Sequence, residues 1–307
     1  MYSVALTTEK QLLFYIPVAY SIPCYAFYIF TIYVLSMRSF KNYFDSTFFT
    51  LFKVQGVIDM LVHVLNWLTL RIPFSGLFNE FFGEPAIERG FFPTFLVFLY
   101  YYATYAQIFN LTLVTLNRLV IIALPGYFRI LWITYLKYVV AITHILPSAL
   151  TWHVLAGGAY FRFMPGQGWA STNNKFLGIR NSLYVLIVIL ITSALNLVVN
   201  MTTVFFIVSK KKCRKNWSEI KLFFLTVSMF LIHLMEAILQ IYAYQSGSDW
   251  AVMKVVFILT SFVKDLTCLT APWFLFITSR TCRRAMCQVV RWTKTNGTDS
   301  SLFAKRS

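Results

Sequence analysis

Long apolar runs constrain this chain more than any other feature. A helix needs about 20 apolar residues to cross a bilayer core of about 30 Å, and seven stretches of the sequence meet that requirement. They lie near residues 12–36, 46–71, 92–124, 136–157, 181–208, 220–245 and 251–278. The runs are continuously apolar and lack the alternation of barrel strands, so they predict helices. We therefore expect an all-α membrane protein, with a seven-transmembrane helix bundle over residues 1–278 and a basic tail over residues 279–307.

Composition supports lipid as the solvent of this bundle. Of the 307 residues, 58% are hydrophobic and 12% are charged, which is too little charge for a soluble exterior. The formal net charge of +16 would suggest nucleic acid as the partner of a soluble protein. Here the Lys and Arg residues gather at the ends of the apolar runs, where they meet lipid headgroups, so we expect no nucleic acid partner.

The distribution of basic residues predicts the topology. With the N-terminus outside, the basic residues on the outer side are Lys10, Arg71, Arg89, Arg162, Lys175, Arg180 and Lys254. Lys53 and Lys264 lie within apolar runs, and the rest of the 27 Lys and Arg residues fall on the other side. An excess of Lys and Arg marks the cytoplasmic side. We therefore expect the N-terminus outside and the C-terminus in the cytoplasm.

Short motifs at the ends of two runs resemble those of G-protein-coupled receptors. The third run closes with Leu116-Asn117-Arg118, followed by Pro125-Gly126-Tyr127 and Trp132, which resembles the Asp-Arg-Tyr region of rhodopsin-like receptors with Asn in place of the acid. The seventh run carries Pro272-Trp273, where a proline frees a backbone carbonyl and loosens the helix. Neither the Asn nor the Tyr of the Asn-Pro-x-x-Tyr motif is present.

Together with residues 48–52 (Phe-Phe-Thr-Leu-Phe) and Asp59, these segments are similar to nematode serpentine chemoreceptors of class gamma, with class V as the nearest alternative. This resemblance implies a chemosensory receptor of the plasma or ciliary membrane that binds an unknown small molecule and acts on a heterotrimeric G protein. The sequence departs from rhodopsin-like receptors because none of its five cysteines falls in an outer loop, which leaves the geometry of those loops open.

Polar residues inside the runs are candidates for function, since ionisable groups in the bilayer are costly and usually face the bundle interior. Asp59, Lys264 and Asp265 lie near one depth. We expect Asp59 to pair with Lys264, or to join a network with its polar neighbours, as a conformational switch or as ordinary interhelical packing. The predicted intramembrane network comprises Asp59, Asn110, Asn196, Lys264 and Asp265.

A second set of residues predicts a ligand pocket in the outer half of the bundle. His233, Glu236 and Gln240 recur at i, i+3 and i+7, so they share one helix face. That face could line a pocket of aromatic walls with a few polar anchors, or form a row of interhelical hydrogen bonds. The residues assigned to the pocket are Asn66, Trp67, Tyr100, Tyr102, His233, Glu236 and Gln240.

The cytoplasmic side carries the residues expected to meet the G protein, which are Asn117, Arg118, Lys211, Lys212 and Arg214. Arg118 could instead extend to the phosphate headgroups. The segment from Arg280 to Lys294 predicts a short amphipathic helix on the membrane surface, and both basic segments are expected to bind anionic lipids of the cytoplasmic leaflet. Cys282 and Cys287 are possible palmitoylation sites or simple free thiols.

Enzymatic function is disfavoured, because the four histidines are scattered over three of the apolar runs and share no motif. The sequence has no CxxC or HxxxH pair, so we expect no metal and no cofactor. The remaining alternative to a receptor is a multi-span transporter or a ligand-gated channel subunit, although seven spans do not divide into two inverted repeats.

Overall fold

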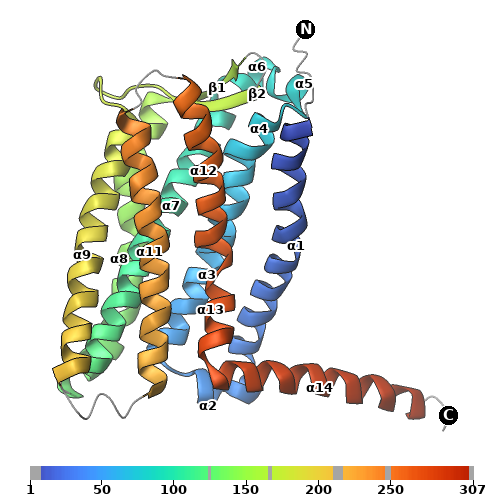
Figure 1. Ribbon diagram of the computed structural model, residues 1–307, viewed down its shortest axis with the longest axis vertical. Coiled ribbons are helices and arrows are strands. Elements are labelled where there is room, and N and C mark those ends of the chain that lie inside the picture. The colour runs from blue at the N-terminus through green and yellow to red at the C-terminus, as the bar shows by residue number, and fades with distance from the viewer. Residues whose placement is uncertain (1–7, 124–125, 165–167, 210–216, 246–249, 304–307) are drawn as a thin grey trace.

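Long helices run side by side through the structure (Figure 1), and both apolar and polar side chains are buried among them. The computed structural model describes residues 8–123, 126–164, 168–209, 217–245 and 250–303. Six of its helices are long and apolar enough to cross a membrane, namely Leu13–Ser36, Thr47–Ser75, Phe91–Ala123, Gly126–Gly157, Asn181–Ser209 and Ile220–Gln245. Large apolar side chains on their outer faces are exposed, as lipid-facing residues are.

The helices follow one another up and down the bundle (Figure 1). They are α1 (Thr8–Ser36), α3 (Thr47–Asn66), α7 (Phe91–Ala123), α8 (Gly126–Gly157), α9 (Asn181–Ser209), α11 (Trp217–Gln245) and α12 (Trp250–Leu269). The α3 helix continues through a π-helical turn, η2 (Trp67–Arg71), into α4 (Ile72–Ser75). Two short elements, η1 (Arg38–Phe40) and α2 (Lys41–Phe44), join α1 to α3.

The last helix of the bundle is interrupted. It consists of α12 and α13 (Ala271–Thr278), which run in line on either side of Thr270 (Figure 1). Pro272 occupies the first turn of α13 and has no N–H to donate to a carbonyl of the preceding turn. The helix is therefore interrupted next to this proline. The bundle is thus an all-α serpentine membrane fold, in which this last helix also carries buried charges.

A β-hairpin covers one end of the bundle, which we call the hairpin end. Strands β1 (Ala159–Met164) and β2 (Gly168–Asn173) pair antiparallel between α8 and α9. Phe161 and Trp169 are buried against Phe82, from the loop that contains α5 (Asn79–Phe82) and α6 (Pro85–Glu88). This aromatic cluster fixes the hairpin to the bundle. Such a hairpin was not predicted, because its strands are short and their buried partners lie far away in the sequence.

Gly168 allows the hairpin to approach the bundle closely. Its φ of 102° lies in the region that favours glycine, and a Cβ there would stand 2.7 Å from the carbonyl oxygen of Pro73. The hydroxyl of Thr94 on α7 adds a further tie, since it accepts a hydrogen bond from the Ala159 amide at 3.0 Å. The hairpin therefore rests directly on α4 and α7.

The opposite end of the bundle, which we call the tail end, is closed by α14 (Arg280–Phe303). This helix runs across the bundle axis beneath α1 (Figure 1). Its apolar stripe of Cys282, Ala285, Met286 and Val289 is buried in the main hydrophobic cluster. The predicted amphipathic helix is present, and most of its apolar face packs on the bundle rather than on the membrane surface.

The fourth helix differs most from its predicted range. It begins at Gly126, earlier than the predicted start near residue 136. The intervening residues 126–135 include Gly126, Arg129 and Thr134, which lower the local hydropathy, so an apolar window begins too late. The part of a helix that extends beyond the hydrocarbon core does not need to be apolar, so hydropathy does not show where such a helix begins.

Candidate functional site: buried charges around the last helix

Two consecutive charged residues on α12 face different neighbours. Lys264 and Asp265 are both buried, with 1% and 4% of their surface exposed. Successive residues of an α-helix point about 100° apart, so one helix can present the two charges to separate partners. Lys264 reaches α11, whereas Asp265 reaches α3 and α1. Opposite charges therefore connect α12 to the helices on both of its sides.

Glu236 on α11 is the partner of Lys264. Its carboxylate oxygen Oε1 lies 2.5 Å from the Lys264 Nζ, and both side chains are almost completely buried. His233, one turn earlier on α11, places its Nδ1 3.5 Å from Glu236 Oε2. The pair thus links α11 to α12 inside the bundle, where little water competes for either charge.

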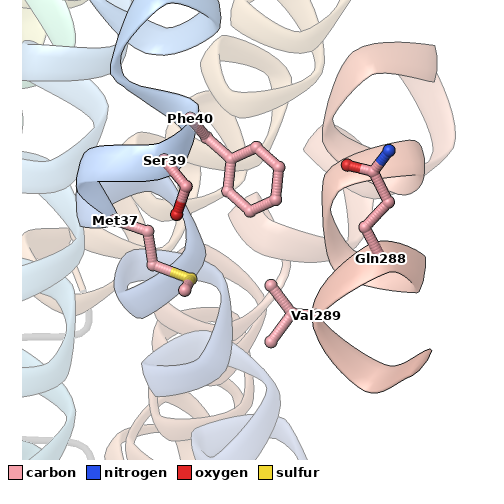
Figure 2. A pocket seen from close by; sticks show the side chains of 5 residues that line it. All are labelled: Met37, Ser39, Phe40, Gln288 and Val289. Carbon is pink, nitrogen blue, oxygen red and sulfur yellow. The ribbon is translucent and has the colours of Figure 1, made fainter. Parts of the chain in front are cut away.

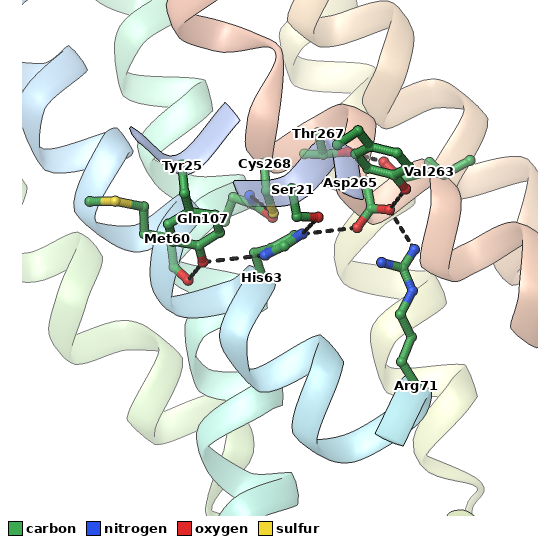
Figure 3. A network of polar contacts seen from close by, with 11 residues as sticks. Ser21, Tyr25, Met60, His63, Arg71, Gln107, Val263, Asp265, Thr267 and Cys268 are labelled. Carbon is green, nitrogen blue, oxygen red and sulfur yellow. Dashed lines mark hydrogen bonds and ion pairs between the residues drawn. The ribbon is translucent and has the colours of Figure 1, made fainter. Parts of the chain in front are cut away.

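Asp265 is the centre of a second cluster (Figure 3). Arg71, from the end of η2, donates to Asp265 Oδ2, and the hydroxyl of Tyr20 on α1 donates to the same oxygen. The Nε2 of His63 on α3 lies 3.1 Å from Asp265 Oδ1. The guanidinium of Arg71 also lies 4.9 Å from the ring centroid of Trp67. Asp265 therefore joins α1, α3 and α12.

Asp59 forms a third cluster with neutral donors. Tyr28, Gln55 and Gln107 donate hydrogen bonds to its carboxylate at 2.7, 2.6 and 2.7 Å. Asn110 in turn donates to Gln55 Oε1 at 2.7 Å. Asp59 and Asn110 are thus connected through the side-chain amide of Gln55, which lies on the same face of α3 as Asp59.

The predicted pairing of Asp59 with Lys264 is wrong. Lys264 faces Glu236 on α11, and Asp265 faces Arg71 and His63. Asn196 is also separate, since its amide donates to Thr112 at 3.1 Å between α9 and α7. Similar depth in the bilayer did not determine the partners, because the direction in which each side chain leaves its helix decides which neighbour it meets.

The residues predicted to line a ligand pocket are only partly brought together. His233 and Glu236 are in contact, while Gln240 and Trp67 are half-buried. Asn66 and Tyr100 are buried within the bundle. Tyr102 turns away from Tyr100 and donates to the His144 carbonyl on α8 at 3.1 Å, because residues two apart lie on nearly opposite sides of a helix. Tyr102 therefore does not share a wall with Tyr100.

Besides Glu236, whose Oε2 lies 3.5 Å from His233 Nδ1, two residues of this set hold buried polar atoms that need partners. The amide nitrogen and oxygen of Asn66 and the Nε2 of His233 have no hydrogen-bond partner among the residues that the structure describes. An unsatisfied buried polar atom costs free energy and generally marks the position of a water or a ligand. These atoms are the strongest structural indication of where a bound molecule would be held.

Asn117 and Arg118 occupy the tail end of α7, and both are buried. The amide oxygen of Asn117 accepts hydrogen bonds from Thr47 at 2.6 Å and from the Trp132 indole at 2.8 Å. The guanidinium carbon of Arg118 lies 3.6 Å from the centroid of the Phe48 ring. Only 1% of Arg118 is exposed, so its extension to lipid headgroups is wrong for this structure. Lys211, Lys212 and Arg214 lie outside the described residues.

The two candidate palmitoylation sites have different environments. Cys282 is fully buried in the apolar stripe of α14, and Cys287 is exposed. Burial raises the pKa of the Cys282 thiol to about 12, although the nearby Arg283 acts in the opposite direction. Acylation and alkylation require an accessible thiolate. Cys282 is therefore a poor acceptor, and Cys287 remains the candidate.

We expect N-ethylmaleimide to label Cys287 of the folded protein and to spare Cys282 at neutral pH, because the Cys282 thiol stays protonated far below pH 12 and is enclosed. Peptide mapping by mass spectrometry measures both positions, and denatured protein serves as the control in which both react. Labelling of Cys282 in the folded protein at the rate of Cys287 would contradict the packing of α14.

Sequence reasoning missed several residues of the charged clusters. Arg71 was assigned to the outer side but is buried in the bundle, since its side chain reaches from the end of η2 to Asp265. A signal was present, because Gln55, Asp59 and His63 recur every fourth residue on an otherwise apolar helix and thus define one polar face. Tyr20 and Tyr28 gave no such signal among the many aromatic residues.

Long apolar helices around buried charges, with an amphipathic helix across one end, define the class of serpentine integral membrane receptors. The chain belongs to the Srg family of chemoreceptors, which residues 14–286 match. It is similar to serpentine receptor class gamma-31 of Caenorhabditis elegans, with 23% identity over 84% of this chain and 86% of the relative. Serpentine receptor class gamma-11 of the same organism is 22% identical over 59% of this chain and 56% of the relative.

These comparisons confirm the predicted resemblance to class gamma. The protein is a chemosensory serpentine receptor embedded in a membrane, and membership of this family implies a receptor without enzymatic activity.

Proposed function

We propose that this receptor binds an external small molecule at the hairpin half of the bundle and activates a heterotrimeric G protein at the tail end. The proposed orientation places the N-terminus outside and the C-terminus in the cytoplasm, in the plasma or ciliary membrane. The burial of Arg71 leaves fewer basic residues for the hairpin end, which supports this orientation. In this orientation the last helix, α12 with α13, completes the seventh crossing.

The ligand step rests on one observation, the buried polar atoms of Asn66 and His233 that have no partner among the described residues. A ligand that carries hydrogen-bonding groups would satisfy them. His233 adjoins Glu236, so such a ligand would contact the helix face that holds the ion pair between α11 and α12. Binding there could change how α11 packs on α12, because the ion pair of Glu236 with Lys264 joins these two helices.

The G-protein step rests on Asn117 and Arg118. Arg118 is enclosed beside Phe48, so it becomes available to a partner only when the helices at the tail end move apart. The basic residues Lys211, Lys212 and Arg214 belong to the same proposed surface, although they lie outside the described part of the chain. A cationic surface at this end would also attract anionic lipids of the cytoplasmic leaflet.

Expression of the receptor with an N-terminal epitope and a G-protein activation readout tests this proposal. We expect antibody staining of unpermeabilised cells, and a ligand screen that yields an agonist. Asn66→Ala should then reduce agonist potency about five- to tenfold, the value of one lost hydrogen bond. Asn196→Ala is the matched control, because Asn196 bonds Thr112 elsewhere in the bundle. Equal potency in wild type and Asn66→Ala would remove the pocket, and staining only after permeabilisation would remove the orientation.

A further inference from the structure

An open cavity of about 290 Å³ lies at the tail end, away from the clusters described above. It is lined by Met37, Ser39 and Phe40 on one side and by Gln288 and Val289 on the other. Figure 2 shows the Phe40 ring and Gln288 on opposite sides of this cavity, with Met37 and Val289 near one another. We call this cavity the tail slot.

The position of the tail slot suits a lipid. It lies between η1, which directly follows α1, and α14, which runs beneath α1 at the edge of the bundle (Figure 1). The end of α1 is where a transmembrane helix leaves the hydrocarbon core and meets headgroups. The side chains of Met37, Phe40 and Val289 make the slot mainly apolar, while Ser39 and Gln288 are polar.

Basic residues surround the tail slot on both sides. Arg38 and Lys41 flank its wall in η1 and α2. On α14, Arg284 and Arg291 stand at i−4 and i+3 from Gln288, so they share the helix face that borders the slot, and both are exposed. Asp45 is the one acidic residue in residues 37–45 and 280–291. The charge around the slot is therefore strongly positive.

We propose that the tail slot binds one acyl chain of an anionic phospholipid, whose phosphate lies among Arg38, Lys41, Arg284 and Arg291. The apolar walls take the chain, which loses contact with water, and the cations take the headgroup. An apolar cavity beside the cations distinguishes a defined lipid site from a general attraction of the basic tail to the membrane, because that attraction needs no cavity. It holds whichever ligand or G protein the receptor uses.

Lipid retention by the full-length receptor tests the proposal. Purified receptor is exchanged into phosphatidylcholine nanodiscs that contain a minor fraction of phosphatidylserine, and bound lipid is measured by native mass spectrometry. We expect retained phosphatidylserine in the wild type and about a fivefold weaker binding for each of Arg284→Gln and Arg291→Gln. Gln288→Trp fills the slot from an exposed position and leaves every charge in place, so it should also release the lipid.

Arg180→Gln is the matched control, because it removes the same charge from an exposed position at the hairpin end. Equal loss in Arg180→Gln would show an effect of net charge and overturn the site. Loss in the arginine variants with full retention in Gln288→Trp would show surface attraction without a slot and also overturn it. Equal retention of phosphatidylcholine and phosphatidylserine would mean that the cations do not select the lipid, which overturns the proposal. Co-purification of a peptide or of a second receptor copy in place of lipid would also overturn it, because the slot would then hold another occupant.

Discussion

Lys264→Ala should lower the free energy of unfolding of the receptor by about 3–5 kcal/mol, the usual cost of removing one partner from a buried ion pair. The variant leaves the Glu236 carboxylate in the bundle interior without the ammonium that lies 2.5 Å away in the wild type. Thermal unfolding of purified receptor and the amount that reaches the cell surface both measure this change. The variant should fold poorly or appear at the surface in much reduced amount.

The matched controls separate charge from packing. Lys254→Ala changes the same residue type near the start of α12, at a half-buried position, and should change stability little. Lys264→Met with Glu236→Gln removes both charges and keeps similar volumes, so it should restore most of the lost stability. A Lys264→Ala receptor as stable as the Lys254→Ala receptor would mean that the ion pair does not hold α11 to α12.

Arg118→Ala should abolish agonist-driven G-protein activation while the receptor still reaches the surface. The proposed interface depends on the guanidinium of Arg118, which lies at the tail end of α7. Arg118→Lys should restore only part of the response, because an ammonium lacks the planar fork of N–H donors that a guanidinium presents to a partner. A surface-expressed Arg118→Ala receptor that signals as the wild type does would exclude Arg118 from the interface.

The aromatic contact of Arg118 gives this experiment a second arm. The Phe48 ring lies 3.6 Å from the guanidinium carbon, and a desolvated cation–π contact contributes about 2 kcal/mol. Phe48→Leu should therefore ease the release of Arg118 and raise basal signalling, by up to about 30-fold. Phe49→Leu is the control, since it removes a neighbouring buried ring that makes edge-to-face contacts with Phe44 and Phe48. Similar basal activity in both variants would contradict a restraining role of Phe48.

The buried charges of α12 form links to several other helices. α12 is linked by Lys264 to α11 and by Asp265 to α3 and α1. Any shift of α12 must break or carry along one of these links, and each link is strong because the interior excludes water. The charges on α12 therefore couple the arrangement of three other helices.

The hairpin illustrates where sequence reasoning stopped. The absence of an outer-loop cysteine left the geometry of this loop open, and the structure fixes it with Phe82, Phe161 and Trp169. Aromatic residues make up 19% of the chain, so three of them could not be singled out in advance. Gly168 is likewise required because a Cβ there would collide with the Pro73 carbonyl oxygen. That oxygen belongs to a segment far away in the sequence, so the sequence around Gly168 does not reveal the contact.

The sequence by itself determined that this protein is a helical membrane bundle with a basic tail, because hydropathy and helix length follow from local composition and from the thickness of a bilayer. It also located Asp59, Lys264, Asp265 and Arg118 as residues of interest, since charge within an apolar run is visible without a structure. Only the tertiary structure decided their partners. The rotation of each helix about its axis sets whether Lys264 meets Asp59 or Glu236, and that rotation results from the packing of all the helices together.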